Sequence, residues 1–239
     1  DSGTTEVKKH TTPVVYLDMP SYFYELSSTS DNNQIANTAK DFLKKNYGID
    51  HTAYTFYLSS GEADDPKSAS IAKSLVNRLI IPFFRNKKLV YYQARSLEQN
   101  PKIKYINANA PKSNVVFGYD NLFIDLQSPL YVFESPLDSI HVNGIAVMEN
   151  VMTSQQIEII EKSPRKKVLV PDKFNDSNRL LDQAISLKWD ICLPDIGKKY
   201  KDISEAIVGY GKLYVLNSMR NNIYNYKQAE VLGKIYCKA

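Results

Sequence analysis

Beyond Pro129 the sequence alternates short apolar runs with longer amphipathic stretches, and this rhythm restricts the fold more than any other feature of the chain. Four runs have the length and composition of buried strands, at 130–133, 145–148, 168–170 and 191–193. Three stretches of helical period lie between them, at 137–142, 153–162 and 175–187. Strands joined by helices need right-handed crossovers and form a mainly parallel sheet. We therefore predict an α/β domain over residues 129–212, with one more helix at 201–209.

Acidic residues stand where these strands end. Glu134 and Asp138 follow the first run, Asp172 follows the third, and Asp202 lies in the connection after the fourth. The carboxyl ends of parallel strands line one edge of a sheet, so these acids converge on a single crevice. Carboxylates gathered there repel one another unless a cation compensates, most simply Mg²⁺, which favours oxygen ligands. The spacing predicts a phosphoryl-transfer site.

The first half of the chain contains a strongly basic segment. Residues 71–119 carry nine lysines and arginines but a single acid, Glu98. Aromatic and amide side chains are interleaved with these charges, at Tyr91, Tyr92, Gln93, Tyr105 and Asn107. One interpretation is a solvated basic surface, but the interleaving favours a surface that contacts phosphates. We predict that this segment binds a polyanion.

Local patterns in residues 1–128 predict a smaller mixed subdomain. Apolar runs at 79–84 and 89–95 flank a short polar turn, which is typical of a β-hairpin in a small antiparallel sheet. We also expect a polar lead-in at 1–33, a helix at 33–47 and a polar surface loop at 61–68. Two further strands are expected at 103–106 and 115–117. Residues 213–239 form an aromatic and Asn-rich tail without a clear period.

Length and composition exclude several classes of protein. A chain of 239 residues can hold one large domain or two small ones. No apolar run approaches the roughly 18 to 20 residues that span a bilayer, and the N-terminus lacks the regions of a signal peptide. We therefore expect a soluble, cytoplasmic protein that does not act at a membrane. Cys192 and Cys237 lack CxxC spacing and His10, His51 and His141 lack ligand spacing, so neither a zinc site nor a disulfide framework is indicated.

With these acids located, residues 129–212 resemble a TOPRIM domain, the module shared by topoisomerases, certain nucleases, recombination proteins and DnaG-type primases. Its motif places a glutamate after the first strand and an acidic motif after the third. Four ordered blocks further upstream resemble those of the DnaG-type RNA polymerase core, at 77–84, 90–97, 104–107 and 116–120. The resemblance covers residues 78–212 and is nearest to the primases of tailed bacteriophages.

The resemblance assigns roles to the acids. Glu134 would be a metal ligand or the acceptor of the proton from an attacking 3′-hydroxyl, while Asp172 and Asp202 would be metal ligands. Most relatives have a second aspartate where this chain has Phe174. Asp176 is the nearest substitute, although it could equally be the N-cap of the following helix. For Asp138, capping and the orientation of its neighbours are the expected tasks.

Basic and polar positions of the first half match the family's groove for the template and the incoming nucleotide. Arg78, Arg95, Lys104 and Lys112 would neutralise phosphates without reading the bases. Tyr105 and Asn107 would stack on a base or donate a hydrogen bond to it, and Tyr105 could instead be a half-buried strand residue.

The resemblance implies an enzyme, a DNA primase that joins ribonucleoside triphosphates into a short RNA primer on single-stranded DNA with Mg²⁺ or Mn²⁺. A zinc-binding domain, in the same chain or a partner, and a replicative helicase would complete its function. The first residue is not methionine, which is consistent with such a domain having been cut away. Two alternatives remain open, a metal-dependent TOPRIM nuclease and a non-catalytic module that binds single-stranded DNA or a helicase.

Overall fold

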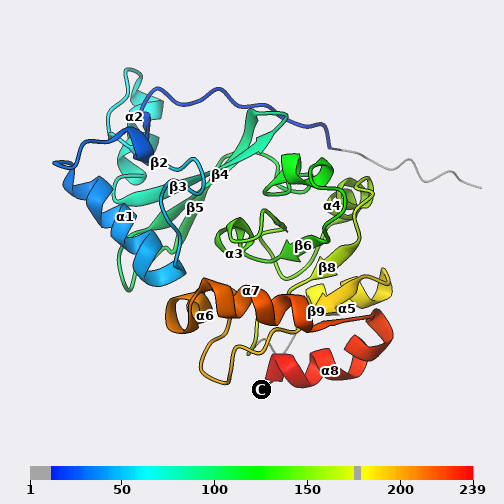
Figure 1. The fold of residues 1–239 in the computed structure, drawn as a ribbon. Coiled ribbons are helices and arrows are strands. Elements are labelled where there is room, and N and C mark those ends of the chain that lie inside the picture. Colours follow the sequence, from blue (N-terminus) through cyan, green and yellow to red (C-terminus); the bar gives the residue numbers. More distant parts are fainter. Residues whose placement is uncertain (1–11, 175–178, 239) are drawn as a thin grey trace, which may run out of the picture.

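The computed structural model describes residues 12–174 and 179–238, which form a mixed α/β fold with two sheets (Figure 1). The first sheet contains β1 (Phe23–Glu25), β2 (Tyr57–Ser59), β3 (Arg78–Arg85), β4 (Lys88–Ser96) and β5 (Tyr105–Asn107). The second contains β6 (Leu130–Phe133), β7 (Ile145–Ala146), β8 (Lys167–Leu169), β9 (Asp190–Cys192) and β10 (Ile223–Tyr224). The predicted fold class is therefore confirmed.

The first sheet is antiparallel throughout and has the order β1-β2-β3-β4-β5. Its longest pair is the predicted hairpin of β3 and β4. Asn86 and Lys87 form the turn with φ of 52° and 61°, as the tight two-residue turn of a hairpin requires. The Asp120 carboxylate accepts hydrogen bonds from both of their amides, at 2.7 and 3.1 Å, and so holds the turn in place.

The second sheet has the order β10-β9-β8-β6-β7, and β7, β6, β8 and β9 are parallel. The chain leaves β6 for β7 on one side and returns to β8 on the other side. In open α/β sheets such a change of direction leaves a crevice beyond the carboxyl ends of the two strands. The crevice here lies beyond β6 and β8, at the edge where the acids were predicted.

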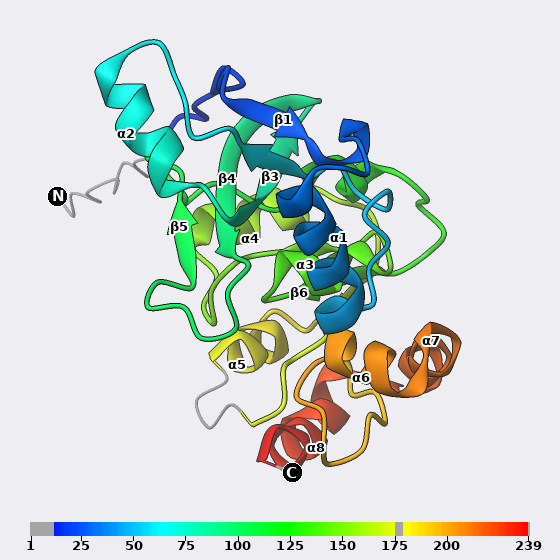
Figure 2. The ribbon, with the colours of Figure 1, turned by 90° about the vertical axis from the view of Figure 1, so that its left-hand side faces the viewer.

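Helices cover both sheets, and the helix predicted over 33–47 is confirmed. The helix α1 (Gln34–Tyr47) is capped by the Asn33 side chain, which accepts a hydrogen bond from the Ala36 amide, and it closes at Gly48 with φ of 63°. A methyl group on Gly48 would lie 2.7 Å from Ile207 of α6 (Ile203–Tyr210), so α1 ends against α6 (Figure 2). Between them along the chain lie α3 (Pro136–Ile140), α4 (Ser154–Glu161) and α5 (Arg179–Ser186).

Two expectations for local structure were wrong. The surface loop predicted over 61–68 ends earlier, because α2 (Pro66–Ser74) begins with Pro66 at its first position and Asp65 as N-cap, both favourable there. The described part of the tail, 213–238, is not irregular, since α7 (Lys212–Asn221), β10 and α8 (Tyr226–Lys238) lie there. β10 pairs with β9 and α8 packs on α5, so this segment packs back on the second sheet.

Phe117 joins the two sheets. Its backbone pairs with Ala146 of β7 through hydrogen bonds of 2.9 and 3.1 Å, while its buried ring lies 5.0 Å from the rings of Tyr54 and Phe83. The predicted strand at 115–117 is therefore reduced to a single bridge, but this bridge connects the two sheets. Among the described residues, no helix is long and apolar enough to cross a membrane.

Candidate functional site

Glu134 and Asp172 flank the crevice of the second sheet. Glu134 directly follows β6 and is half-buried, and its carbonyl accepts a hydrogen bond from the Met148 amide at 2.9 Å. Asp172 follows β8. The Val170 amide continues the pairing of β8 with β6 by donating a 2.9 Å hydrogen bond to the Val132 carbonyl. The parallel register of β6 and β8 thus brings together two acids that are distant in sequence.

A third acid reaches the same edge from the connection before α6. The Lys173 amide donates to the Lys201 carbonyl at 2.7 Å, which holds the segment after β8 beside the start of α6. Asp202 is the N-cap of α6 and accepts a hydrogen bond from the Glu205 amide at 2.8 Å. Its carboxylate therefore has a capping function in addition to any chemistry at the crevice.

Asp138 fastens α3 to α6. Its buried carboxylate accepts hydrogen bonds from the Ser204 amide, at 3.1 Å, and from the Ser204 hydroxyl. This contact fixes the first turn of α6 relative to the segment that carries Glu134. The orienting role expected of Asp138 stays a prediction, and this contact is the observation that favours it.

The four carboxyl groups share one electrostatic environment. Burial raises the pKa of Glu134, of Asp172 and of Asp202, and it raises the pKa of Asp138 to about 7. The charges of Asp138, Asp202 and Glu134 raise the pKa of Asp172 further. Repulsion of this kind is expected of carboxylates in one neighbourhood, and that the four acids form one site stays a prediction.

The donor chemistry of this edge suits Mg²⁺ or Mn²⁺, because carboxylate oxygens are the ligands that hard divalent cations prefer. The residues that the structure describes nevertheless contain no group of three acids, histidines or cysteines close enough to hold a metal ion as they stand. Asp176 lies outside the described residues. Phe174, where the resemblance implies an aspartate, is about half exposed and has φ of 58°.

A cleft of about 900 Å³ opens beside Asp202 and runs between α1, β4 and the segment 199–208. Lys104 lines it from the loop before β5, and Lys201 lines it from the opposite side. Burial and the charges of Arg95 and Lys201 lower the pKa of the Lys104 ammonium, while Asp202 and Glu205 oppose this effect. Basic groups of the first half and acids of the second half therefore face one space.

The other predicted phosphate contacts are placed differently. Arg95 lines the cleft but is 9% exposed, because its guanidinium lies over the rings of Phe42 and Tyr105 at 5.5 and 5.2 Å. Arg78 lies outside the cleft and donates to the carbonyls of Ala94 and Ile103. Lys112 is also outside it and forms an ion pair with Glu149.

Tyr105 and Asn107 have protein partners of their own. Tyr105 is partly buried, the Arg95 guanidinium lies 5.2 Å from its ring, and burial raises its pKa. Asn107 is exposed, and its side-chain oxygen accepts a hydrogen bond from Gln93 at 3.1 Å. Of the six predicted nucleic-acid contacts, the structure thus brings Arg95 and Lys104 to the cleft beside the acids.

Sequence reasoning assigned no role to several residues of the cleft. Lys201 and Glu205 lie at the start of α6 beside Asp202, and Phe42 and Tyr47 come from the last turns of α1. The sequence could have indicated Lys201, because a lysine directly before a predicted metal ligand places a positive charge at the predicted site. No sequence signal marks Phe42 or Tyr47, which reach the cleft only because α1 ends against α6.

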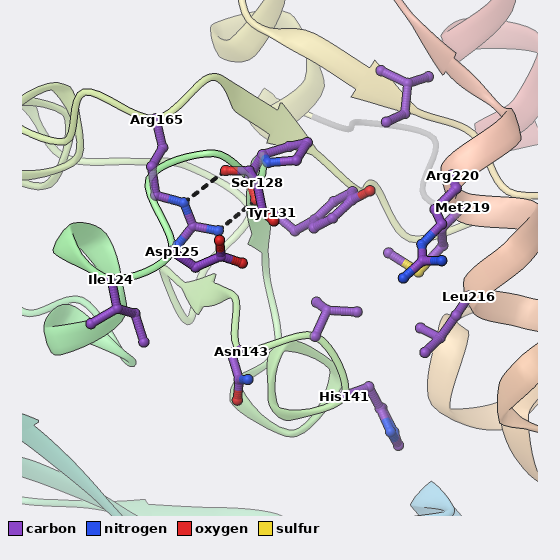
Figure 3. Close-up of a pocket in the computed structure, with 13 residues that line it drawn as sticks. Ile124, Asp125, Ser128, Tyr131, His141, Asn143, Arg165, Leu216, Met219 and Arg220 are labelled. Atoms are coloured by element: carbon purple, nitrogen blue, oxygen red, sulfur yellow. Dashed lines mark hydrogen bonds between the residues drawn. The ribbon is translucent and has the colours of Figure 1, made fainter.

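A second cavity, of about 470 Å³, lies at the opposite, amino-terminal edge of the parallel sheet (Figure 3). Arg165 and Arg220 approach it from different sides, from the loop before β8 and from α7. Arg165 is buried and donates to the carbonyls of Ser128, Asn121 and Pro129 at 2.6 to 3.0 Å. None of the acids at the carboxyl edge lines this cavity, so the two sites are separate.

His141 lines the second cavity. We predict that its titration makes the stability of the folded protein depend on pH. Burial and the charge of Lys212 lower its pKa to about 4, although its ring nitrogen Nε2 is 2.9 Å from the Tyr47 carbonyl and 3.5 Å from the Ser204 hydroxyl. Because this pKa lies below the unfolded value, the neutral ring stabilises the fold above pH 6.5, and this contribution disappears as the pH falls toward 4. Between pH 7.5 and 5 the loss should be about 2 kcal/mol.

The measurement is urea unfolding of the wild type and of His141→Gln at both pH values. Subtracting the variant removes the titration of carboxyl groups distant from this position, so the difference reports His141 together with the Ser204–Asp138 contact beside it. A wild type that loses no more stability than the variant would contradict the prediction.

Comparison with solved structures identifies the fold. The RNA polymerase domain of Mycobacterium tuberculosis primase DnaG has a TM-score of 0.66 at 14% identity, over 84% of this chain and 81% of that one. A DnaG primase catalytic domain bound to ssDNA has a TM-score of 0.60 at 15% identity, over 85% and 78%. The Aquifex aeolicus primase, with its zinc-binding and RNA polymerase domains, has a TM-score of 0.53 at 19% identity, over 67% and 45%.

No family model and no curated protein matches the sequence. The structural likeness therefore establishes the fold alone. At that level it confirms the resemblance to the DnaG-type RNA polymerase core that the ordered sequence motifs indicated.

Proposed function

We propose that this chain is the catalytic core of a DNA primase, which synthesises short RNA primers on single-stranded DNA by metal-dependent nucleotidyl transfer. The observation that supports this proposal is that Glu134 and Asp172 follow the neighbouring parallel strands β6 and β8, while Asp202 begins α6 beside a cleft that Lys104 and Arg95 also line, within the fold of a primase catalytic domain. A solved DnaG catalytic domain of this fold is bound to ssDNA, which supports DNA as the polyanion.

The residues divide the chemistry between them. Glu134 takes the proton from the attacking 3′-hydroxyl, because its half-buried carboxylate has a raised pKa and lies beyond β6. Asp172 and Asp202, with Asp176 as a candidate, would hold Mg²⁺ or Mn²⁺, which when bound would neutralise charge on the transferring phosphoryl group. Lys104 neutralises phosphates in the cleft. The Arg95 guanidinium, which lies over the rings of Phe42 and Tyr105, adds a second positive charge to the lining of the cleft.

We further propose that the chain is akin to the primases of tailed bacteriophages and that residues 129–212 are a TOPRIM domain. We also propose that a zinc-binding domain and a replicative helicase assist this core. The Aquifex aeolicus structure combines a zinc-binding domain with an RNA polymerase domain, which supports the first of these partners.

The direct test is incubation with labelled ribonucleotides, single-stranded template and Mg²⁺ or Mn²⁺. Labelled dinucleotides and longer products support the primase, whereas a shortened template identifies a metal-dependent nuclease. Retention of the template without any product identifies a binding module. One observation favours this last alternative, namely that the described acids form no ready-made metal cluster.

We predict that the charge of Lys104 strengthens binding of the single-stranded template. Its exposed ammonium stands among other cations, so an incoming phosphate relieves repulsion as well as forming a contact. Lys104→Ala should weaken the affinity for a single-stranded oligonucleotide by about 5- to 10-fold and reduce the salt slope by about 1. Fluorescence anisotropy between 50 and 200 mM salt measures both quantities.

Lys234→Ala is the matched control for this experiment. Lys234 is exposed on α8 and does not line the cleft, so its loss should leave affinity within about twofold. Equal effects of the two variants would show that the cleft is not where the strand binds.

A further inference from the structure

Three tyrosine rings, those of Tyr200, Tyr210 and Tyr214, follow one another beside the cleft. Tyr200 and Tyr210 meet edge to face with ring centroids 5.1 Å apart, and the Tyr214 ring lies 5.2 Å from that of Tyr210. Tyr210 ends α6 and Tyr214 lies in the first turn of α7, and Gly211 joins the two helices (Figure 2). We call these three rings the tyrosine row.

Two glycines make room for the tyrosine row. A methyl group on Gly209 would collide with the Tyr200 ring, and one on Gly197, which has φ of 67°, would lie 2.8 Å from the Tyr210 hydroxyl oxygen. Glycine weakens a helix, yet Gly209 lies inside α6. The backbone thus gives up some helix stability at the position where the Tyr200 ring needs the space.

The outer part of the tyrosine row does not belong to the core. Tyr210 and Tyr214 are 48% and 49% exposed, whereas Val215 and Met219 are the side chains that α7 buries. Leu213, next to Tyr214, is also exposed. Exposed aromatic and apolar side chains that gather on one stretch of chain are typical of a surface that binds a partner.

Lysines flank the tyrosine row in the sequence. Lys198, Lys199 and Lys212 are exposed, and none of them forms an ion pair with another residue that the structure describes. The Lys199 ammonium lies 5.3 Å from the centroid of the Tyr200 ring. Protein interfaces are enriched in tyrosine but depleted in lysine, whereas surfaces for single-stranded nucleic acid combine aromatic rings with positive charges. This combination favours a nucleic-acid strand over a protein.

The tyrosine row is continuous with the cleft beside Asp202. Lys199, Tyr200 and Val208 all line that cleft. Tyr200 therefore belongs both to the cleft and to the row, and a strand that leaves the cleft past Tyr200 comes next to Tyr210 and Tyr214.

We propose that single-stranded DNA leaving the cleft continues over Tyr210 and Tyr214 and that its bases stack on these two exposed rings. Lys199 and Lys212 neutralise the phosphates that pass beside the rings. This inference rests on the proposed function and deepens it, because it names the surface that holds the strand outside the cleft. Stacking does not depend on the identity of the base, so the contact suits a template of any sequence.

The test is fluorescence anisotropy with labelled DNA strands of about 4 and about 16 nucleotides, on the wild type and Tyr214→Ala. The short strand is chosen to occupy the cleft alone, whereas the long strand also reaches the tyrosine row. Loss of the Tyr214 ring should weaken the affinity for the long strand at least about fivefold and leave that for the short strand within about twofold.

Two further variants at Tyr214 separate stacking from apolar contact. Tyr214→Phe keeps the ring and should retain the affinity for the long strand within about twofold. Tyr214→Leu keeps an apolar side chain without a ring and should lose as much affinity as Tyr214→Ala. Should the alanine variant fail to fold, as judged by circular dichroism, the comparison of leucine with phenylalanine decides the question.

Tyr16→Ala is the matched control. Tyr16 is 48% exposed and lies near a lysine, Lys88, at 5.7 Å, but it does not line the cleft. Its loss should leave the affinity for the long strand within about twofold. Equal losses for Tyr16→Ala and Tyr214→Ala would overturn the inference, because any exposed ring would then suffice.

The outcomes also distinguish this inference from the proposed function. If the wild type makes primers but all variants at Tyr214 bind the long strand as it does, the inference fails although the proposed function stands. If Tyr214→Leu binds the strand as tightly as the wild type, the surface is an apolar docking site instead of a stacking platform, and the inference is overturned. If the wild type binds neither strand, both fail.

Discussion

Replacing Asp172 by asparagine should reduce primer synthesis by at least about 100-fold while leaving the fold as stable as before or more stable. Asparagine has the same shape but carries no charge and binds a hard cation poorly. Burial and three neighbouring acids penalise the Asp172 carboxylate in the folded protein, so removal of its charge should raise the free energy of unfolding by about 1 kcal/mol. Loss of activity with a gain of stability is the signature of a residue kept for function.

The measurements are product formation from labelled ribonucleotides and urea unfolding at pH 7.5. Glu158→Gln is the matched control, since Glu158 is an exposed acid on α4 and its loss changes the net charge by the same amount. The control should keep wild-type activity. An Asp172→Asn variant that still makes primers at the wild-type rate would remove Asp172 from the site.

Replacing Phe117 by alanine should destabilise the protein by about 3 to 5 kcal/mol, the largest effect on stability that we expect from a single side chain. The Phe117 ring is 2% exposed and packs edge-on against Phe83 and at a tilt against Tyr54. Its removal leaves a cavity at the point where the two sheets meet. Because the cleft lies between elements of both halves, binding of single-stranded DNA should weaken as well.

Urea unfolding measures the effect on stability, and anisotropy with an oligonucleotide measures the effect on binding. Phe123→Ala is the control, since Phe123 is 46% exposed and contacts only the Tyr119 ring among the described aromatic residues. Its cost should stay below about 1 kcal/mol. A loss of less than 1 kcal/mol for Phe117→Ala would show that the sheets are held together elsewhere.

Patterns of short range predicted most elements of the fold. The hairpin of β3 and β4 followed from two apolar runs around a polar turn, and α1 followed from apolar positions at helical spacing and Gly48. The parallel sheet followed from the alternation of strands and helices. These predictions hold because local periodicity reports which face of an element is buried, whatever it packs against.

The carboxyl-terminal segment shows where that method failed. The helices α7 and α8 expose large apolar side chains, among them Leu213 and Val231, so their apolar residues do not fall on one face. A mixed pattern of this kind does not differ from that of a loop until the packing partner is known. The partner of α8 is α5 together with β9, at the far edge of the second sheet.

The sequence by itself predicted that Glu134 and Asp172 follow strands of a parallel sheet, because strands that alternate with helices run in one direction, and the structure has this pairing. That these two acids and Asp202 form one site stays a prediction. Only the tertiary structure decided which cations face them. Lys104 and Lys201 share the cleft, whereas Arg78 is held elsewhere by two backbone carbonyls and Lys112 by a glutamate. The reason is that the direction of a long basic side chain depends on the partner that its charge finds, and a sequence does not name that partner.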